Sequence, residues 1–184
     1  MIVIGVSGGI ASGKSIVCQV FELLGGKVIS ADHVGHEALD TPQVQAALIQ
    51  AFGSAILGRD GRIVRQALGE IVFGDSIERA RLDAIIHPPL VAEIHRRIRE
   101  HRDTGYDGVI VVDAALIVEW DEVDMLDALV IVTAPRSQRI SWLMARNNLS
   151  KQDATQRIDA QLTDAERVRW ADYVIVNNGR VAEL

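Results

Sequence analysis

Eight residues near the start of the chain have the types and spacing of a phosphate-binding loop. Residues 8–15 read Gly-Gly-Ile-Ala-Ser-Gly-Lys-Ser and match the pattern G-x-x-x-x-G-K-[ST] in full. Glycine lets such a loop bend so that successive backbone N–H groups point at phosphate oxygens. Lys14 would reach the β- and γ-phosphates of ATP, and the Ser15 hydroxyl would ligate Mg²⁺. The expected ATP contacts of the loop and the next residue are Gly8, Gly9, Ala11, Ser12, Gly13, Lys14, Ser15 and Ile16.

The residues on either side of this loop decide between two interpretations. An incidental lysine in a glycine-rich turn would give the same letters without nucleotide binding. However, an apolar run at residues 2–6 precedes the loop and a helical spacing of apolar residues at 15–24 follows it. A strand before the loop and a helix after it are the context that nucleotide binding requires, because the helix N-terminus adds positive charge at the phosphates. The phosphate-binding interpretation is therefore favoured.

Two aspartates follow expected strands. Asp32 comes after residues 27–30 and could accept a proton from an attacking hydroxyl, or it could cap a helix starting near residue 33. Asp113 follows the apolar run at 108–112, where a carboxylate could hold Mg²⁺ or could serve as an ordinary turn residue. Position alone leaves both alternatives open.

Cationic and aromatic residues farther along the chain have a structural explanation as well as a functional one. Arg139 and Arg146 are seven residues apart on an expected helix, so they share a face that could close over a triphosphate or could be a solvated basic stripe. His87, directly before a proline, is expected to interrupt a helix rather than to act as a base. Three tryptophans are expected to be core or packing residues, with stacking of one of them on a base as the less favoured alternative; they are Trp120, Trp142 and Trp170.

The elements that must position these residues alternate between strands and helices. Short apolar runs predict strands at 2–6, 27–30, 108–112, 128–133 and 173–176, and helical spacing predicts helices at 15–24, 137–146 and 151–162. The stretch from 31 to about 101 is helical in pattern, with breaks expected at 41–42, 53, 58–61 and 87–89. This order predicts an α/β fold of three layers, a parallel sheet with flanking helices, in which ligands bind at the carboxyl ends of the strands.

Bulk properties narrow the classes of protein. The chain has 184 residues, of which 48% are hydrophobic, enough for one domain. A formal net charge of −6 argues against a nucleic-acid partner, because a polyanion requires a basic surface. One cysteine allows no internal disulfide, which fits a reducing cytoplasm. The chain opens without a leader pattern and carries no run of about 18 apolar residues, so no membrane partner is expected.

Three classes of function compete at this point. A small-molecule kinase explains the phosphate loop, Asp32 and the two arginines together. A nucleotide-dependent switch is less favoured, because we find no Asn-Lys-x-Asp motif for reading a guanine base. A nucleic-acid-dependent ATPase conflicts with the acidic charge and the short chain.

An ordered series of residues resembles one family across nearly the whole chain, the dephospho-coenzyme A kinases. The series comprises residues 7–15, Val28-Ile29-Ser30-Ala31-Asp32, Arg65 with Leu68 and Phe73, His87-Pro88, Leu116 with Glu119, Gln138-Arg139, Arg146, Gln161, and Ala-Asp-Tyr-Val-Ile-Val-Asn-Asn-Gly at 171–179. A phosphate loop alone indicates only a nucleotide, whereas this series is far more specific.

The resemblance implies a function and a set of roles. The enzyme would transfer the γ-phosphoryl group of ATP to the ribose 3′-hydroxyl of dephospho-coenzyme A, with Mg²⁺ held by Ser15 and Asp113. Asp32, Lys14 and Arg139 would be catalytic, and Arg146 and Asn177 would join the ATP contacts. The acceptor would be bound by Asp32, Arg65, His87, Leu116 and Glu119.

The same resemblance implies a nucleotide-kinase architecture. The core would comprise about 1–31 and 106–184, with a helical acceptor-binding insertion at about 32–105 and a small lid at about 137–162. We expect a cytoplasmic monomer or weak homo-oligomer.

Four residues depart from the family pattern. Ser30 replaces the first aspartate of Asp-Ala-Asp, Ala11 a loop glycine, Ile16 a threonine, and Ala115 a proline. None of these substitutions removes a group that the chemistry requires.

Overall fold

The computed structural model describes residues 1–72 and 75–179, so Phe73 of the series above lies outside the described residues. The chain divides into two compact units. One comprises residues 1–30 and the chain from 98 onward, and the other comprises residues 31–97. We describe each unit by itself, and the organisation into a single domain stays a prediction.

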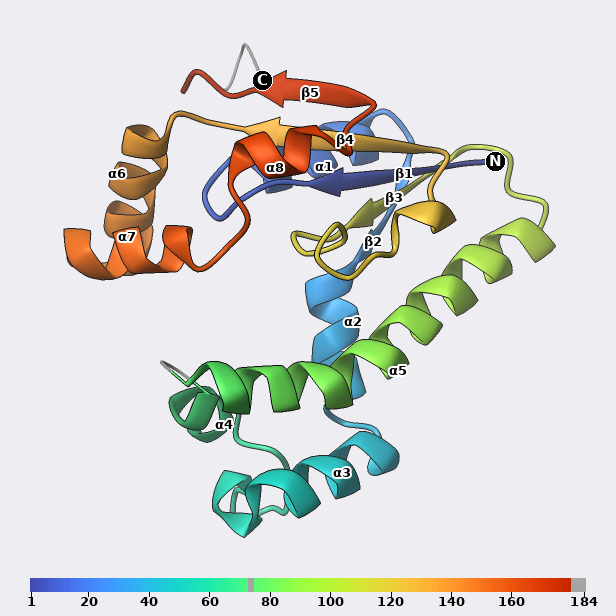
Figure 1. Ribbon diagram of the computed structural model, residues 1–184. Coiled ribbons are helices and arrows are strands. Elements are labelled where there is room, and N and C mark those ends of the chain that lie inside the picture. The colour runs from blue at the N-terminus through green and yellow to red at the C-terminus, as the bar shows by residue number, and fades with distance from the viewer. Residues whose placement is uncertain (73–74, 180–184) are drawn as a thin grey trace. The chain divides into compact units, whose positions relative to one another are not determined.

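The first unit is built on a five-stranded sheet (Figure 1). Its strands are β1 (Ile2–Ser7), β2 (Lys27–Ser30), β3 (Val109–Asp113), β4 (Ala128–Thr133) and β5 (Tyr173–Val176). They pair in the order β2-β3-β1-β4-β5, and every pair is parallel. The central strands are apolar on both faces because helices cover both faces of a parallel sheet. The predicted α/β fold is therefore confirmed.

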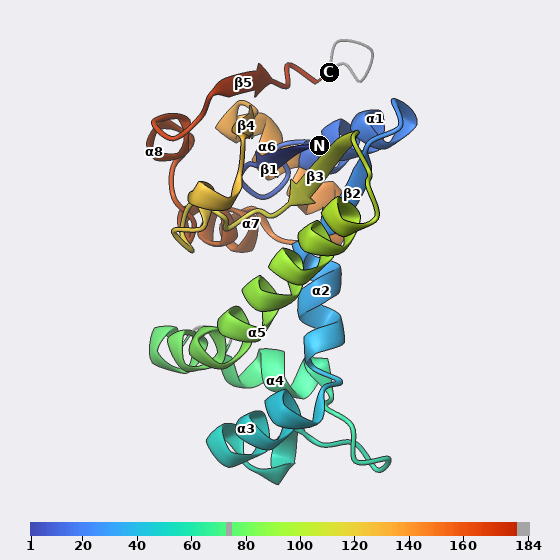
Figure 2. The same ribbon diagram turned by 90° about the vertical axis from the view of Figure 1, so that its right-hand side faces the viewer.

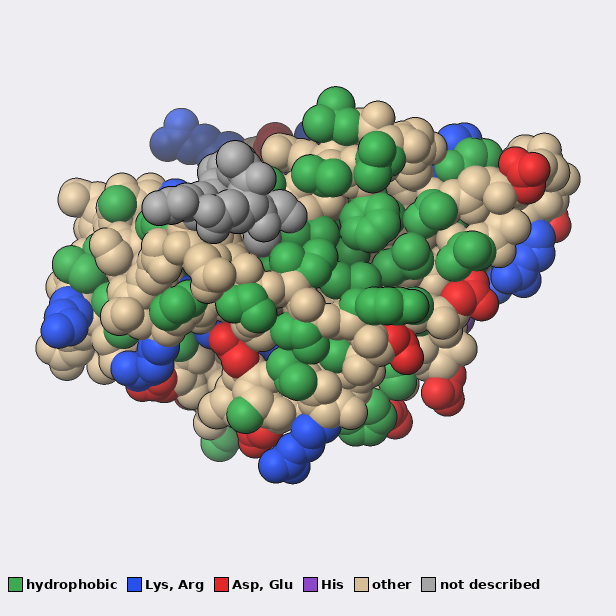
Figure 3. Space-filling model, turned by 90° about the horizontal axis from the view of Figure 1, so that it is seen from above, with side chains coloured by type: hydrophobic (Ala, Val, Ile, Leu, Met, Phe, Trp, Pro, Cys, Tyr) green, Lys and Arg blue, Asp and Glu red, His purple; other side chains and the backbone are tan. Residues whose placement is uncertain are grey.

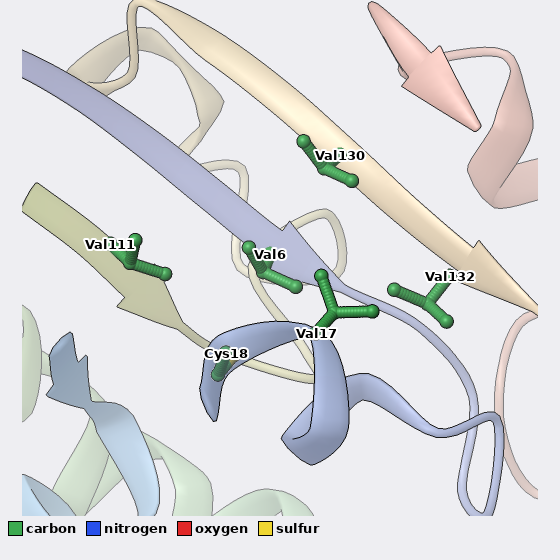
Figure 4. Packing of buried hydrophobic residues seen from close by; sticks show 6 residues of the cluster. All are labelled: Val6, Val17, Cys18, Val111, Val130 and Val132. Atoms are coloured by element: carbon green, nitrogen blue, oxygen red, sulfur yellow. The ribbon is translucent and has the colours of Figure 1, made fainter. Parts of the chain in front are cut away.

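Helices of this unit cover the two faces of the sheet. They are α1 (Lys14–Leu23), α6 (Arg136–Asn147), α7 (Lys151–Asp159) and α8 (Asp164–Val168), with a 3₁₀ turn, η2 (Val123–Met125). Figures 1 and 2 place α1 and α8 on opposite sides of the sheet. Val17 and Cys18 of α1 pack against valines of three strands, as Figure 4 shows; these are Val6, Val111, Val130 and Val132. This cluster anchors the start of α1 above β1 and β3.

Two aspartates fix the starting ends of neighbouring strands in the same way. The Asp127 carboxylate accepts a hydrogen bond of 2.7 Å from the N–H of Val3, and its own N–H donates to the Val3 carbonyl over 2.8 Å. Asp172 makes the same reciprocal pair with Leu129, over 2.7 and 2.9 Å. Each pair satisfies backbone groups at a strand end that the ladder alone would leave open.

The second unit contains helices only. Its elements are α2 (Ala31–Ala38), α3 (Pro42–Phe52), η1 (Ser54–Ile56), α4 (Arg65–Val72) and α5 (Ser76–Asp103), the last of which continues into the first unit. A separate core holds the unit together, formed by Leu39, Val44, Leu48, Ile56 and Leu68. The expected breaks at 41–42, 53 and 58–61 are present, since α3 begins at Pro42 and ends before Gly53.

The expected break at residues 87–89 is wrong, because α5 runs through Pro88 and Pro89. Each proline removes one helical N–H donor and crowds the preceding turn. Packing on both sides offsets that loss: Ile86 packs against the core of the helical unit, and Leu90 is 5% exposed. The helix axis changes direction along α5 instead of the helix ending (Figure 1).

The expectation that the tryptophans are packing residues is wrong for Trp170, which is 53% exposed. Trp120 and Trp142 are half-buried, which is compatible with packing. Trp170 lies between α8 and β5, an edge strand that packs against a neighbour on one side only, so few side chains are available to cover it. Figure 3, seen from above, shows hydrophobic side chains gathered on the side where β5 lies in Figure 1. No described helix is long and apolar enough to cross a membrane.

Candidate active site

The loop between β1 and α1 has the close packing that its glycines predict. A Cβ atom at Gly8 would lie 2.4 Å from the Val132 carbonyl oxygen, and one at Gly9 would lie 2.2 Å from Nη2 of Arg139. Neither position therefore tolerates a side chain without rearrangement. Ser12 is fully buried, and among residues 1–72 and 75–179 its hydroxyl oxygen has no hydrogen-bond partner. The loop thus presents backbone and hydroxyl groups rather than bulky side chains.

Lys14 and Asp113 form an ion pair at the carboxyl ends of β1 and β3. Their side chains are only 14% and 15% exposed. The register of the sheet explains the meeting, because Val6 of β1 pairs with Asp113 of β3 and the loop leaves β1 one residue later. Hence the structure brings together the cation and the carboxylate that the sequence analysis assigned to phosphate and to Mg²⁺.

Cys18 lies one helical turn beyond Lys14. Burial, and after it the nearby Asp113 carboxylate, raise the pKa of its thiol to about 12. The thiol is therefore protonated at neutral pH and offers no thiolate to a metal. The described residues contain no group of three or more His, Cys, Asp or Glu side chains able to hold a metal ion.

The two arginines expected to share a role have different surroundings. Arg139 is 4% exposed; its Nε donates to the Ile10 carbonyl over 2.9 Å, and its Nη1 donates to Asp164 over 2.9 Å. Burial lowers the pKa of this guanidinium, and the Asp164 charge opposes that shift. Arg146 is exposed, and its Nε donates to Oδ1 of the adjacent Asn147 over 3.1 Å. The alternative that both arginines form a solvated basic stripe is therefore wrong for Arg139, which is buried. It fits Arg146, which is exposed.

Asn177 is hydrogen-bonded to the backbone of the phosphate loop. It is 5% exposed, its Nδ2 donates to the Ser12 carbonyl over 2.9 Å, and its Oδ1 accepts from the Gly179 N–H over 2.9 Å. Both ends of the amide are therefore used within the protein. A direct contact between Asn177 and ATP stays a prediction.

Glu119 forms an ion pair with a residue that sequence reasoning missed. Its Oε1 lies 2.6 Å from Nη2 of Arg167, which is fully buried and also donates to the Leu162 carbonyl over 2.6 Å. The short helix α8 carries Arg167, and a capping box between Thr163 and Glu166 starts that helix. The Thr-x-x-Glu pattern at residues 163–166 is the sequence signal that could have located helix α8. Leu116 is half-buried in the loop after β3.

Asp32, Arg65 and His87 belong to the helical unit. Asp32 is exposed in the first turn of α2, which begins at Ala31, so the alternative that it caps a helix starting near residue 33 is wrong. Arg65 is exposed at the start of α4, and His87 is half-buried within α5. Their part in a common site with the loop stays a prediction.

The central strand of the parallel sheet, β1, is followed by the glycine-rich loop and then by α1. This arrangement defines a P-loop protein of the nucleotide-kinase type. A shikimate kinase from Acinetobacter baumannii has the same fold, with a TM-score of 0.53 and 14% identity, covering 100% of this chain and 87% of that one. A family model described as dephospho-CoA kinase matches residues 2–183, and the chain belongs to this family.

Individual relatives agree with the family. The chain is similar to the dephospho-CoA kinases of Geobacter sulfurreducens, at 41% identity over 100% of this chain and 93% of that protein, and of Carboxydothermus hydrogenoformans, at 40% over 97% and 87%. Among solved structures, TT1252 from Thermus thermophilus has a TM-score of 0.80 at 28% identity, covering 99% and 91%. Dephospho-CoA kinase from Campylobacter jejuni has a TM-score of 0.65 at 27%, covering 98% and 90%.

Proposed function

We propose that the protein transfers the γ-phosphoryl group of ATP to the ribose 3′-hydroxyl of dephospho-coenzyme A, giving coenzyme A and ADP, the last step of coenzyme A biosynthesis. The observation that carries this proposal is the Lys14–Asp113 pair beside a glycine loop at the carboxyl ends of β1 and β3, in a chain of the dephospho-CoA kinase family. The protein would act in the cytoplasm as a monomer or weak homo-oligomer.

Lys14 and the loop would bind the triphosphate. When ATP enters, the Lys14 ammonium exchanges the Asp113 carboxylate for β- and γ-phosphate oxygens, so its charge stays balanced. The hydroxyl of Ser15 and the carboxylate of Asp113 are hard oxygen donors, which fit Mg²⁺. Bound there, Mg²⁺ would neutralise charge on the phosphates. Asn177 holds the Ser12 carbonyl, and this hydrogen bond would help to keep the loop in shape for the ligand.

The chemical step would rest on positioning and charge. The acceptor oxygen forms a bond to the γ-phosphorus while the bond from that phosphorus to the β,γ-bridging oxygen breaks, and ADP leaves. The proton of the acceptor hydroxyl passes to the Asp32 carboxylate. Arg139, buried beside Gly9, adds positive charge close to the loop, and Arg146 would join it when the lid closes. Arg65, His87, Leu116 and Glu119 are the candidates for the acceptor pocket.

Product formation tests the function directly. Purified protein receives ATP, Mg²⁺ and dephospho-coenzyme A, with AMP, gluconate and no acceptor as parallel reactions, and coenzyme A is quantified by mass spectrometry. We expect coenzyme A in the first reaction and no phosphorylated product in the others. ATP consumption with another acceptor would overturn the substrate and would leave the P-loop kinase class in place.

A conservative substitution tests the proposed base. Asp32→Asn should lower kcat at least 100-fold, because general-base catalysis contributes about 10² to 10⁴. The KM for ATP should stay within about twofold. Asp40→Asn is the matched control, since Asp40 is also exposed and lies two residues after the end of α2. A kcat for Asp32→Asn within a few-fold of the wild type would remove Asp32 from this role.

A further inference from the structure

The backbone of one residue at the apex of the phosphate loop is held at both of its polar groups. The N–H of Ile10 donates to Oε1 of Gln161 over 2.8 Å, and the carbonyl of Ile10 accepts from Nε of Arg139 over 2.9 Å. Asp164 in turn fixes Arg139 through a hydrogen bond of 2.9 Å. All three side chains come from the stretch that begins at α6 and ends at α8, more than 120 residues away in the chain.

Apolar contacts join the same partners. Ile10 and Ala11 pack against a buried cluster from α6 and α7, formed by Ile140, Leu143, Ala154 and Ile158. The loop apex is therefore attached to these helices through its side chains as well as through its backbone.

This attachment fixes the direction of an N–H group. A peptide unit is planar and trans, so the carbonyl of Ile10 and the N–H of Ala11 point to opposite sides of the chain. While Arg139 holds that carbonyl, the Ala11 N–H must point away from Arg139. Among the hydrogen bonds between described residues, none uses the Ala11 N–H. Phosphate loops bind their ligand with unpaired backbone N–H groups of this kind.

Ala11 also needs support for its backbone conformation. Its φ of 61° lies in the left-handed region, which a residue with a Cβ atom adopts only at an energetic disadvantage. Glycine would reach the same φ readily. A turn hydrogen bond from the Ser12 N–H to the Gly9 carbonyl over 3.0 Å spans Ile10 and Ala11 and supports this conformation from within the loop. The contacts from outside the loop, which converge on Ile10 and Ala11, add to that support.

We propose that Gln161 is a positioning residue that holds the loop apex in its phosphate-binding conformation. The inference rests on the proposed binding of ATP at this loop and adds to it the means by which the loop keeps its shape. A neutral amide suits the position, because it accepts the Ile10 hydrogen bond without placing a negative charge beside the phosphates.

The first test removes only the hydrogen-bond acceptor of the Gln161 side chain. Gln161→Met keeps the length of the side chain. The Kd for ADP with Mg²⁺ is measured by titration calorimetry in the absence of dephospho-coenzyme A. We expect the Kd to rise about tenfold, with the melting temperature and the KM for dephospho-coenzyme A nearly unchanged. Gln156→Met on the exposed face of α7 is the matched control and should change neither value. Gln161→Asn is the second variant, for use where the methionine variant does not fold. Its side chain is too short to reach Ile10, so the Kd for ADP should again rise about tenfold.

The second test asks whether Gln161 acts through the strained loop. In an Ala11→Gly background, Gln161→Met should raise the Kd no more than about threefold, because glycine adopts a positive φ without support. An unchanged Kd for Gln161→Met and Gln161→Asn, or the same tenfold rise in both backgrounds, would overturn the proposal. Wild-type protein that binds ADP but forms no coenzyme A would overturn the proposed substrate and leave this inference intact.

Discussion

Arg167 carries a charge in the interior of the protein, and Glu119 is its carboxylate partner. The guanidinium is fully buried while the Glu119 side chain is 22% exposed, and the two lie 2.6 Å apart. Nε of Arg167 has no hydrogen-bond partner among the described residues. A buried charge that loses its partner is strongly destabilising, even where the pair itself adds little net stability. Glu119 thus has a structural role in addition to its proposed place near the acceptor.

A single substitution separates the two roles of Glu119. Glu119→Gln should lower the free energy of unfolding by about 2 kcal/mol, because a hydrogen bond remains but the charge is no longer compensated. For a chain of this length we expect the melting temperature to fall by about 4 to 8 °C. The KM for dephospho-coenzyme A should rise together with this loss where Glu119 also contacts the acceptor, and a KM within twofold would leave the structural role alone.

A KM for dephospho-coenzyme A raised tenfold or more, with an unchanged melting temperature, would assign Glu119 to the acceptor pocket and remove its structural role. The double variant Glu119→Gln with Arg167→Met serves as control. It should recover part of the lost stability, since it leaves no unpaired charge.

The predictability of single residues depended on how far apart their partners lie in the sequence. The loop glycines, Lys14 and the place of Asp113 at the end of a strand were predictable, because each follows from a local motif or from the strand pattern. The bond from Gln161 to Ile10 joins residues 151 apart, and the pair of Arg167 and Glu119 joins residues 48 apart. Such contacts depend on how helices pack, and no local pattern encodes them.

Elements were predicted best where their apolar period was clean. All five strands lie within two residues of the expected ranges, because buried parallel strands are short and continuously apolar. Helix α8 was missed because it has only five residues, too few for a helical period. The prolines of α5 were given too much weight, since local propensity yields to packing when a helix has buried residues on both sides of the break.

Charged side chains link α2 to α5 within the helical unit. Arg97 of α5 pairs with Glu37 of α2 and donates from Nε to Glu93 over 2.8 Å, and Arg96 also bonds Glu93, over 2.7 Å. The hydrogen bond from Arg96 is the largest cause of a pKa of about 2 for Glu93. The network therefore holds Glu93 ionised far below the usual titration range of a glutamate.

This arrangement makes the stability of the protein depend on pH. The folded pKa of Glu93 lies below the unfolded value of about 4.5, so its contribution is complete above pH 4.5 and is lost as the pH falls toward 2. Glu93→Gln should lower the free energy of unfolding by about 1 kcal/mol at pH 7, because solvent screens a pair this accessible. That difference should shrink as the pH falls from 4.5, measured by urea unfolding. A difference that stays constant down to pH 3 would contradict the assignment. Glu78→Gln is the control, since the Glu78–Arg81 separation is longer, at 3.8 Å.

At the scale of the whole molecule, the fold class followed from the alternation of strands and helices. The helical unit, residues 31–97, lies in the stretch from 31 to about 101 where the sequence has no strand pattern. The chain passes from one unit to the other after residue 30, where β2 ends, and after residue 97, within α5. Both proposed ligands are polyanions, and the protein carries a net charge of −6. Binding must therefore depend on individually placed cations such as Lys14 and Arg139 rather than on the overall field.

The two units give the proposed ligands different footprints in hydrogen exchange. ADP with Mg²⁺ should slow exchange in peptides that cover the phosphate loop and α1. Dephospho-coenzyme A should slow exchange in peptides between residues 31 and 97, where Asp32, Arg65 and His87 lie. A ligand at a concentration of 100 times its Kd stabilises the folded state by about 2.7 kcal/mol. Amides that exchange only when the binding site unfolds should therefore exchange about 100-fold more slowly. Mass spectrometry of peptic fragments measures both patterns, with gluconate as a control that should protect neither unit. Protection by dephospho-coenzyme A confined to residues 1–30 and 98–179 would show that the helical unit is not the acceptor site, since a ligand protects the segments that must open for it to leave.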